Sequence, residues 1–266
     1  AAPPSSTRRA STAAPPNATM SAYVAEFPDP KIMTDEQFDQ FIKDADDDEG
    51  WTTVSDSAGV AVYEKVIADA PIKCVKMRAT LNASPAVLYD VLHDPDYRKT
   101  WDENMAAGYE IEKLNVNNDV GYYAAKSPFM MISSRDFCNQ RAWRARSTEY
   151  VIRAHTVKHP DMPEQSGYVR AQAIVTGYLL RACKDDENKV VLTYMTQTDP
   201  KGWLPGWLVN KVASKVVPGV IEKLQKASDG YAEWKAKAEN KPDEKPWLDA
   251  GDGTDGGDDD GDGDGD

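Results

Sequence analysis

The sequence predicts an α+β protein in which one curved antiparallel sheet is closed by a long C-terminal helix over an apolar cavity. Nine segments have the alternation and turn residues of strands, and no crossover helix separates any two of them. Near the C-terminal end, apolar residues recur at every fourth position and give a helix one broad apolar face: Leu204, Leu208, Val212, Val216, Val220 and Leu224. A long sheet has to curl, and a curled sheet covered by such a helix encloses a space.

The N-terminal segment, residues 1–33, is rich in Ala, Pro and Ser and is predicted to be a disordered arm. It contains Arg8 and Arg9 and no acidic residue before Glu26, a composition that also suits an organelle transit peptide. Thr34, with Gln37 three residues later, predicts a capping box and therefore a helix that begins there. The acidic run at 44–49 ends this helix, and we interpret it as a solvated surface.

Three strand-like segments follow the first helix, and Ser84 with Pro85 then predicts the N-cap and first turn of a second helix that stops before Pro95. Strand patterning resumes after it and continues to the last helix. The nine predicted strands are 51–55, 59–66, 72–80, 108–114, 120–126, 136–144, 150–158, 168–180 and 190–198. The globular part is expected to span residues 34–249.

The last helix combines its apolar face with a basic side and an aromatic entrance. Lys211 and Lys215 stand on the basic side, and Trp203 and Trp207 lie at the entrance, so this part can contact an interfacial or anionic membrane surface. Pro218 lacks an N–H and should bend the helix, which makes it a candidate hinge. The helix is either packed permanently on the sheet or a lid that moves.

Charge and cysteine content limit the possible partners. Residues 250–266 form an Asp/Gly tail that is predicted to be disordered; its eight aspartates account for most of the net charge of -13 and leave only -5 for the rest. The tail lacks the closing Glu of an EF-hand loop. A mildly acidic chain does not favour nucleic acid as a partner. Three widely spaced cysteines without a CxxC motif predict a reducing compartment, and no apolar run is long enough to span a membrane. We expect a cytoplasmic monomer that contacts membranes peripherally and reversibly.

Enzyme motifs are absent from the sequence. There is no HExxH, GxSxG, Walker A or strand-linked GxGxxG, so we expect no catalytic residues, no metal site and no cofactor. The three histidines, His93, His155 and His159, stand in no catalytic or metal-binding context, and we interpret them as structural. The protein is therefore predicted not to be an enzyme.

Several short motifs occur in a fixed order along the chain: LYDVLHD at 88–94, YRKTWD at 97–102, DVGYY at 119–123, SRDF at 134–137, VKHP at 157–160 and DPKG at 199–202. With these motifs the chain resembles a START domain, of the StAR-related lipid-transfer family. The likeness is greatest to the subgroup that transfers phosphatidylcholine and phosphatidylethanolamine. The resemblance implies a helix-grip fold, in which the sheet grips the C-terminal helix around a lipid tunnel.

Candidate ligand-binding residues follow from two sources. Spacing alone makes Arg98 and Asp102 an ordinary ion pair on one helical turn, whereas the resemblance implies that they lie inside the tunnel near the lipid phosphate. It also implies an aromatic cage for choline, to which Tyr123, Phe137 and Ile174 correspond here. One aromatic is thus missing, and Thr176 replaces a longer amide side chain, so a looser cage for choline or ethanolamine is expected.

We therefore expect a lipid-binding and transfer protein that encloses one glycerophospholipid, phosphatidylcholine or phosphatidylethanolamine, and exchanges it between membranes. Other interpretations remain open at this stage. The protein could be a lipid-gated sensor or interaction module, or a carrier of a sterol, carotenoid or sphingolipid. A cyclase or hydrolase of the same fold is the third alternative, but no acid, base or nucleophile set in the sequence supports it.

Overall fold

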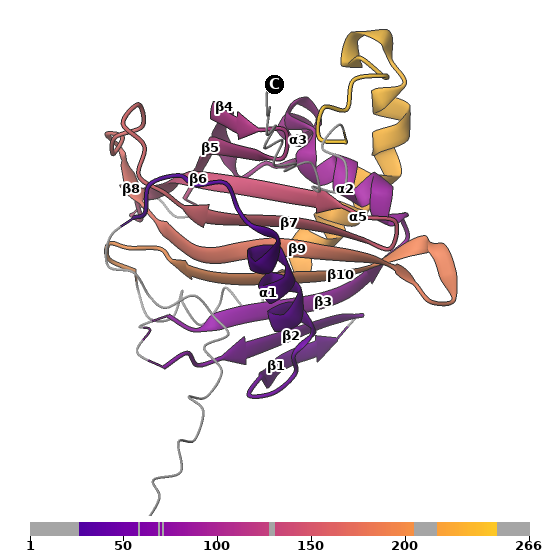
Figure 1. Ribbon diagram of the computed structural model, residues 1–266, viewed down its shortest axis with the longest axis horizontal. Coiled ribbons are helices and arrows are strands. Elements are labelled where there is room, and N and C mark those ends of the chain that lie inside the picture. Colours follow the sequence, from indigo (N-terminus) through magenta and orange to yellow (C-terminus); the bar gives the residue numbers. More distant parts are fainter. Residues whose placement is uncertain are drawn as a thin grey trace, which may run out of the picture.

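The computed structural model describes residues 27–57, 59–68, 70, 72–127, 131–204 and 217–248 (Figure 1). Its centre is one ten-stranded open sheet with the strand order β1-β2-β3-β10-β9-β7-β6-β5-β4, and β8 pairs with β6 beside this path. The strands are β1 (Thr52–Ser57), β2 (Val60–Lys65), β3 (Cys74–Leu81), β4 (Met105–Asn115), β5 (Asn118–Ala125), β6 (Ser134–Ala145), β7 (Glu149–Thr156), β8 (Tyr168–Arg170), β9 (Gln172–Cys183) and β10 (Asp186–Asp199).

The α+β class and the antiparallel sheet are confirmed, but the count of nine strands is wrong by one. The predicted strand 168–180 is divided at Ala171 into β8 and β9, and β8 runs parallel to β6. Contacts with β6 account for the division. Arg170 donates from Nε and Nη2 to the buried Asp136 carboxylate, both at 3.0 Å, and the Ala171 N–H donates to the Asp136 carbonyl oxygen. This buried ion pair holds β8 against β6.

Helix α1 (Asp35–Asp46) lies across one face of the sheet, toward the viewer in Figure 1. The predicted capping box between Thr34 and Gln37 is present. Phe38 and Phe41 are buried against the middle strands, and Gly177 on β9 permits this contact, since an added Cβ would come within 2.7 Å of the Phe41 ring. Close helix-to-sheet packing therefore depends on a residue without a side chain at position 177.

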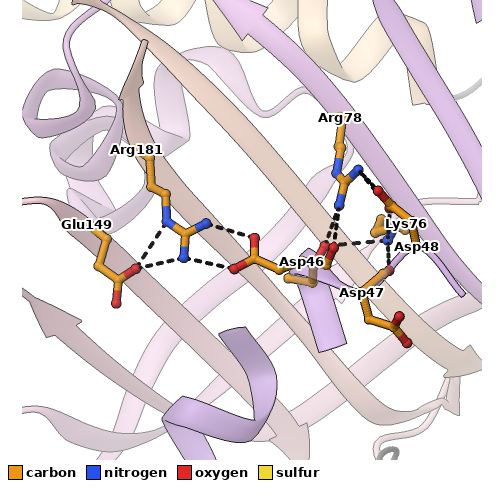
Figure 2. Close-up of polar contacts among 8 residues, drawn as sticks. Asp46, Asp47, Asp48, Lys76, Arg78, Glu149 and Arg181 are labelled. Atoms are coloured by element: carbon orange, nitrogen blue, oxygen red, sulfur yellow. Dashed lines mark hydrogen bonds and ion pairs between the residues drawn. The ribbon is translucent and has the colours of Figure 1, made fainter. Parts of the chain in front are cut away.

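Most of the acidic run at the end of α1 is exposed, as interpreted from the sequence, and basic residues of the sheet also bind it (Figure 2). Lys76 is fully buried and donates to the carbonyl oxygen of Asp47 at 2.5 Å and to the Asp48 carboxylate at 3.1 Å. Arg181 of β9 bridges Asp46 and Glu149. Lys76 and Arg78 donate to carbonyl oxygens at the C-terminal end of α1, where the helix dipole is negative.

The other helices cover the opposite face: α2 (Pro85–His93), α3 (Pro95–Trp101) and α5 (Val217–Lys235), followed by the short η2 (Ala238–Asn240). Ser84 caps α2 and Pro85 is its first residue, as predicted. The buried Asp94 accepts hydrogen bonds from Tyr231 and Lys235 of α5. Leu224 packs in one core cluster with α2, so this described part of the last helix is packed on the fold.

Residues 241–248, here called the C-terminal strap, return from α5 to α2. Asp90 of α2 is buried and accepts from Trp247 Nε1 at 2.7 Å and from Lys245 Nζ at 2.5 Å. Trp247 is itself buried, whereas the next residue, Leu248, is 45% exposed. One carboxylate therefore fixes the position of the strap. Among the described residues, no helix is long and apolar enough to cross a membrane.

Candidate functional site

A cavity of about 420 Å³ lies between the sheet and the helices α2 and α3. Side chains of β4 to β7, β9 and β10 form its wall on the sheet side. On the other side the wall comes from α2, α3 and the C-terminal strap, which contributes Pro246 and Trp247. The apolar face of the last helix, which includes Val220 and Leu224, was expected to cover the cavity. No described residue of α5 lines this wall, and Val220 and Leu224 pack in the core with α2 instead.

Arg98, Asp102 and Tyr123 form a polar cluster at the cavity. Arg98 is on α3, and its Nε donates to Asp102 Oδ2 at 3.2 Å, while the Tyr123 hydroxyl of β5 donates to the same oxygen at 3.1 Å. The Arg98 guanidinium also lies over the Tyr123 ring, 5.1 Å from its centroid. The predicted contact between Arg98 and Asp102 therefore exists, and it lies at the cavity.

Charge in this cluster is stabilised by the neighbouring groups. Burial lowers the pKa of Arg98, but Tyr178, Tyr123 and Asp102 raise it by more, so the guanidinium stays protonated. Burial and Asp102 raise the pKa of Tyr123 to about 12, which keeps the phenol neutral and able to donate. The hydrogen bond from Arg98 to Asp102 uses Nε. The other N–H groups of the guanidinium suit an anionic ligand group.

The predicted cage residues are only partly brought together. Tyr123 and Phe137 face each other from paired positions on β5 and β6, with ring centroids 6.4 Å apart, and both line the cavity. Ile174 does not line it. It is buried at an irregularity of the β9–β10 pairing, where Gln197 pairs with Val175 and Thr198 with Ala173, so the register skips Ile174.

Thr176 lines the cavity and donates its hydroxyl to the Tyr194 oxygen at 3.2 Å. Two tyrosines that the sequence analysis did not select stand beside it. The rings of Tyr178 and Tyr194 lie 4.9 Å apart on paired positions of β9 and β10, and both are in the cavity wall. Strand alternation could have found them, because Tyr178 follows Thr176 by two residues on the same face.

A second ion pair in the cavity wall was also missed. Arg141 of β6 donates from Nε to Asp119 Oδ1 of β5 at 2.8 Å, and the Asp119 carboxylate is almost fully buried. Asp119 and Arg141 are directly paired across the two strands. The signal in the sequence was the even spacing from Asp119 to Tyr123 and from Phe137 to Arg141, which places all four on one face of the sheet.

The residues predicted for the lid and for membrane contact are only partly described. Trp203 is 73% exposed, and Arg135 fixes the chain beside it by donating to the carbonyl oxygens of Pro200 and Lys201, each at 3.1 Å. Trp207, Lys211 and Lys215 lie outside the described residues. Pro218 is the second residue of α5 as described, and its side chain is outside the description.

The described residues contain no group of three or more His, Cys, Asp or Glu side chains arranged to hold a metal ion. Two arginines of the cavity wall are paired with carboxylates, Arg98 with Asp102 and Arg141 with Asp119. This pairing fits a role in binding and orienting a polar group.

Comparison with known proteins gives concordant results from sequence and structure. The family described as START domain matches residues 33–233. START domain-containing protein 10 of Mus musculus is 38% identical over 220 residues, which cover 82% of this chain and 74% of that protein. Phosphatidylcholine transfer protein of Mus musculus is 29% identical over 186 residues, 68% of this chain and 85% of its own. The crystal structure of human STARD10 superposes with a TM-score of 0.76 at 37% identity and covers 82% of this chain and 88% of that one.

Proposed function

The chain belongs to the START domain family, and from this premise we propose that it encloses one glycerophospholipid, phosphatidylcholine or phosphatidylethanolamine, and exchanges it between membranes. The observation that carries the proposal is the cluster of Arg98, Asp102 and Tyr123 at the cavity wall. The name of the mouse phosphatidylcholine transfer protein supports the choice of lipid class.

Physical chemistry supports a carrier that encloses its lipid. A phospholipid has roughly 30 acyl methylenes, and at ~0.8 kcal/mol each their exposure to water costs roughly 24 kcal/mol. A transfer protein has to cover both chains with apolar surface while it holds the headgroup. Arg98 can bind one phosphate oxygen or two, because Asp102 occupies only its Nε, and a charge-assisted pair of this kind is both strong and directional.

Membrane contact is part of the same proposal. The exposed Trp203, with Trp207, Lys211 and Lys215, would meet the interface of the membrane, and Pro218 would act as the hinge of a lid. The contact is peripheral and reversible, and the protein acts as a cytoplasmic monomer without a cofactor. In this proposal residues 34–249 are the lipid-binding domain between an N-terminal arm, 1–33, and an acidic tail, 250–266.

The test is native mass spectrometry with lipid extraction on the full chain purified from cells, comparing wild type with Arg98→Gln. Arg181→Gln is the matched control, because Arg181 also pairs with carboxylates but on the face that α1 covers. We expect one bound phospholipid per chain in the wild type and the control, and its loss in Arg98→Gln. A sterol or carotenoid in the wild type, or equal phospholipid in both variants, would contradict the proposal.

A further inference from the structure

Two residues that line the cavity each have a ring nitrogen that is buried without a hydrogen-bond partner among the described residues: His93 Nε2 and Trp143 Nε1. The two rings are neighbours, with centroids 5.3 Å apart in an edge-to-face arrangement. Trp143 is only 6% exposed. Buried polar groups of native proteins nearly always have a partner, so both atoms indicate a polar ligand group or bound water at this place.

His93 is held in one protonation state by its surroundings. Its Nδ1 lies 3.0 Å from the carbonyl oxygen of Tyr89, and because a carbonyl oxygen only accepts, Nδ1 carries the proton. Burial lowers the pKa of His93 to about 3, so the ring is neutral at physiological pH. Nε2 is therefore a bare acceptor, and what it lacks is a hydrogen-bond donor.

The positive charges near His93 are already neutralised by carboxylates. Arg141 and Arg98 are the cations that act on its ring, and each is paired with a carboxylate, Asp119 and Asp102. On the side of the strap, Trp247 stacks on the His93 ring with centroids 6.0 Å apart. A ligand amine next to His93 thus meets the rings of Trp143 and Trp247, and the two arginines that act on the His93 ring are both paired.

We propose that His93 Nε2 accepts a hydrogen bond from the amino group of the bound headgroup, so that the cavity favours phosphatidylethanolamine over phosphatidylcholine. This inference rests on the proposed function, in which Arg98 binds the phosphate of the same lipid. An ethanolamine headgroup has N–H donors, whereas the quaternary nitrogen of choline has none. With phosphatidylcholine bound, Nε2 has no hydrogen-bond donor, and the free-energy cost of removing this atom from water is not compensated.

Trp143 has the opposite hydrogen-bonding requirement to His93. Its Nε1–H is a donor, so it requires an acceptor, which every glycerophospholipid supplies through its phosphate and ester oxygens. Trp143 therefore does not discriminate between headgroups, and His93 does. This assigns a ligand-binding role to a histidine that the sequence alone led us to interpret as structural.

The experiment is a competition for the full chain among three dioleoyl lipids in equal amounts: phosphatidylethanolamine, its N,N-dimethyl derivative and phosphatidylcholine. The dimethyl lipid keeps the charge and nearly the bulk of choline but has one N–H. Lipid bound after gel filtration is extracted and quantified by mass spectrometry for wild type, His93→Phe and His155→Phe. His155 is the matched control, a partly buried histidine on β7 whose neighbour Ala154 faces the cavity, so that His155 faces away from it.

We expect the wild type and His155→Phe to retain the two N–H lipids over phosphatidylcholine by about fivefold, the effect of one hydrogen bond. His93→Phe should remove this preference. If phospholipid binds but the wild type shows no preference, or the preference survives in His93→Phe, the inference is overturned and the proposed function stands. If none of the three lipids binds, both are overturned.

A measurement on the wild type alone covers the case in which His93→Phe does not fold. The ¹⁵N resonance of His93 Nε2 reports whether this atom accepts a hydrogen bond. Loading the chain with phosphatidylethanolamine should shift it, and loading with phosphatidylcholine should leave it at the position of a bare acceptor. The same position with both lipids would overturn the inference, because bound water or nothing would then be the partner of Nε2.

Discussion

At the scale of single residues, Asp102 has two functions in the structure. It accepts from both Arg98 and Tyr123, and it thereby orients the guanidinium at the cavity and stabilises its charge. Removing one member of a partly buried ion pair costs more than the pair contributes, because the remaining charge keeps its desolvation cost. The apo protein should therefore depend on Asp102 for stability, and the lipid-bound protein should depend on it less.

Asp102→Ala is predicted to lower the free energy of unfolding of the lipid-free chain by about 2 kcal/mol, less than for a fully buried pair because Arg98 is partly exposed. Thermal unfolding with and without phospholipid measures this, and the variant should gain more from the lipid than the wild type does. The control is Asp96→Ala on the same helix, an exposed partner of Lys99, with an effect below about 1 kcal/mol. Equal stability of Asp102→Ala and wild type would contradict the account.

Asp44 supplies a prediction about pH. Burial raises the pKa of Asp44 to about 6, although Gln40 donates to it at 2.9 Å. Between about pH 4 and pH 6 the folded chain binds more protons at Asp44 than the unfolded chain, so this residue lowers stability as the pH rises through that window.

Asp44→Asn should thus stabilise the protein by up to about 3 kcal/mol above pH 6 and by nothing below pH 4. Urea unfolding at several pH values checks this. The exposed Asp56 is the control, and Asp56→Asn should change stability by less than about 0.5 kcal/mol at every pH. A gain that is independent of pH would show that burial of the Asp44 charge is not its cause.

At the scale of elements, local signals were sufficient wherever neighbouring residues set the conformation. Thr34 with Gln37 and Ser84 with Pro85 mark the starts of α1 and α2 correctly, since capping involves groups three residues apart at most. The division of β8 from β9 depends instead on Arg170 meeting Asp136, which are distant in sequence. Neither the hydrophobic periodicity nor the turn residues near position 171 predict such a contact.

The same limit applies to the candidate site. The spacing of Arg98 and Asp102 predicted their contact, because it lies within one helical turn. Tyr178 and Tyr194 come from two strands that meet only through sheet pairing, and Ile174 lost its predicted place through a skipped register position in the same pairing. Register between strands is decided by the packing of the whole sheet, which the sequence of one strand does not contain.

The attachment of α1 gives a prediction at this scale. Lys76→Met should lower the free energy of unfolding by about 3 kcal/mol, because the carbonyl oxygen of Asp47 and the Asp48 carboxylate lose their buried donor (Figure 2). Lys73→Met is the matched control, since Lys73 is exposed and pairs with Glu64 at the surface. Urea unfolding distinguishes the two, and similar small effects would contradict the importance of the buried cation.

At the scale of the whole molecule, the cavity is closed by parts from distant regions of the chain. The sheet supplies one wall, α2 and α3 the other, and the C-terminal strap closes the wall next to His93 with Trp247. Asp90 holds the strap by two hydrogen bonds. The strap is thus a small structural addition whose loss should affect lipid retention more than the fold.

Trp247→Ala is predicted to accelerate the loss of bound phospholipid to acceptor vesicles several-fold. Without the indole ring, an opening forms in the cavity wall through which water can enter and the lipid can leave. Leu248→Ala is the neighbouring control, with an exposed side chain that takes no part in the cavity wall. Transfer of a fluorescent phospholipid from loaded protein to vesicles measures both. Equal release rates for the two variants would mean that the strap does not retain the ligand.

The central claim is that the cavity holds one glycerophospholipid with its phosphate at Arg98. The most direct test is a crystal structure of the full chain loaded with dioleoylphosphatidylethanolamine. The account predicts a phosphate oxygen about 2.8 Å from the Arg98 guanidinium, with both acyl chains enclosed. A phosphate bound elsewhere, at Arg141 or outside the cavity, would contradict it.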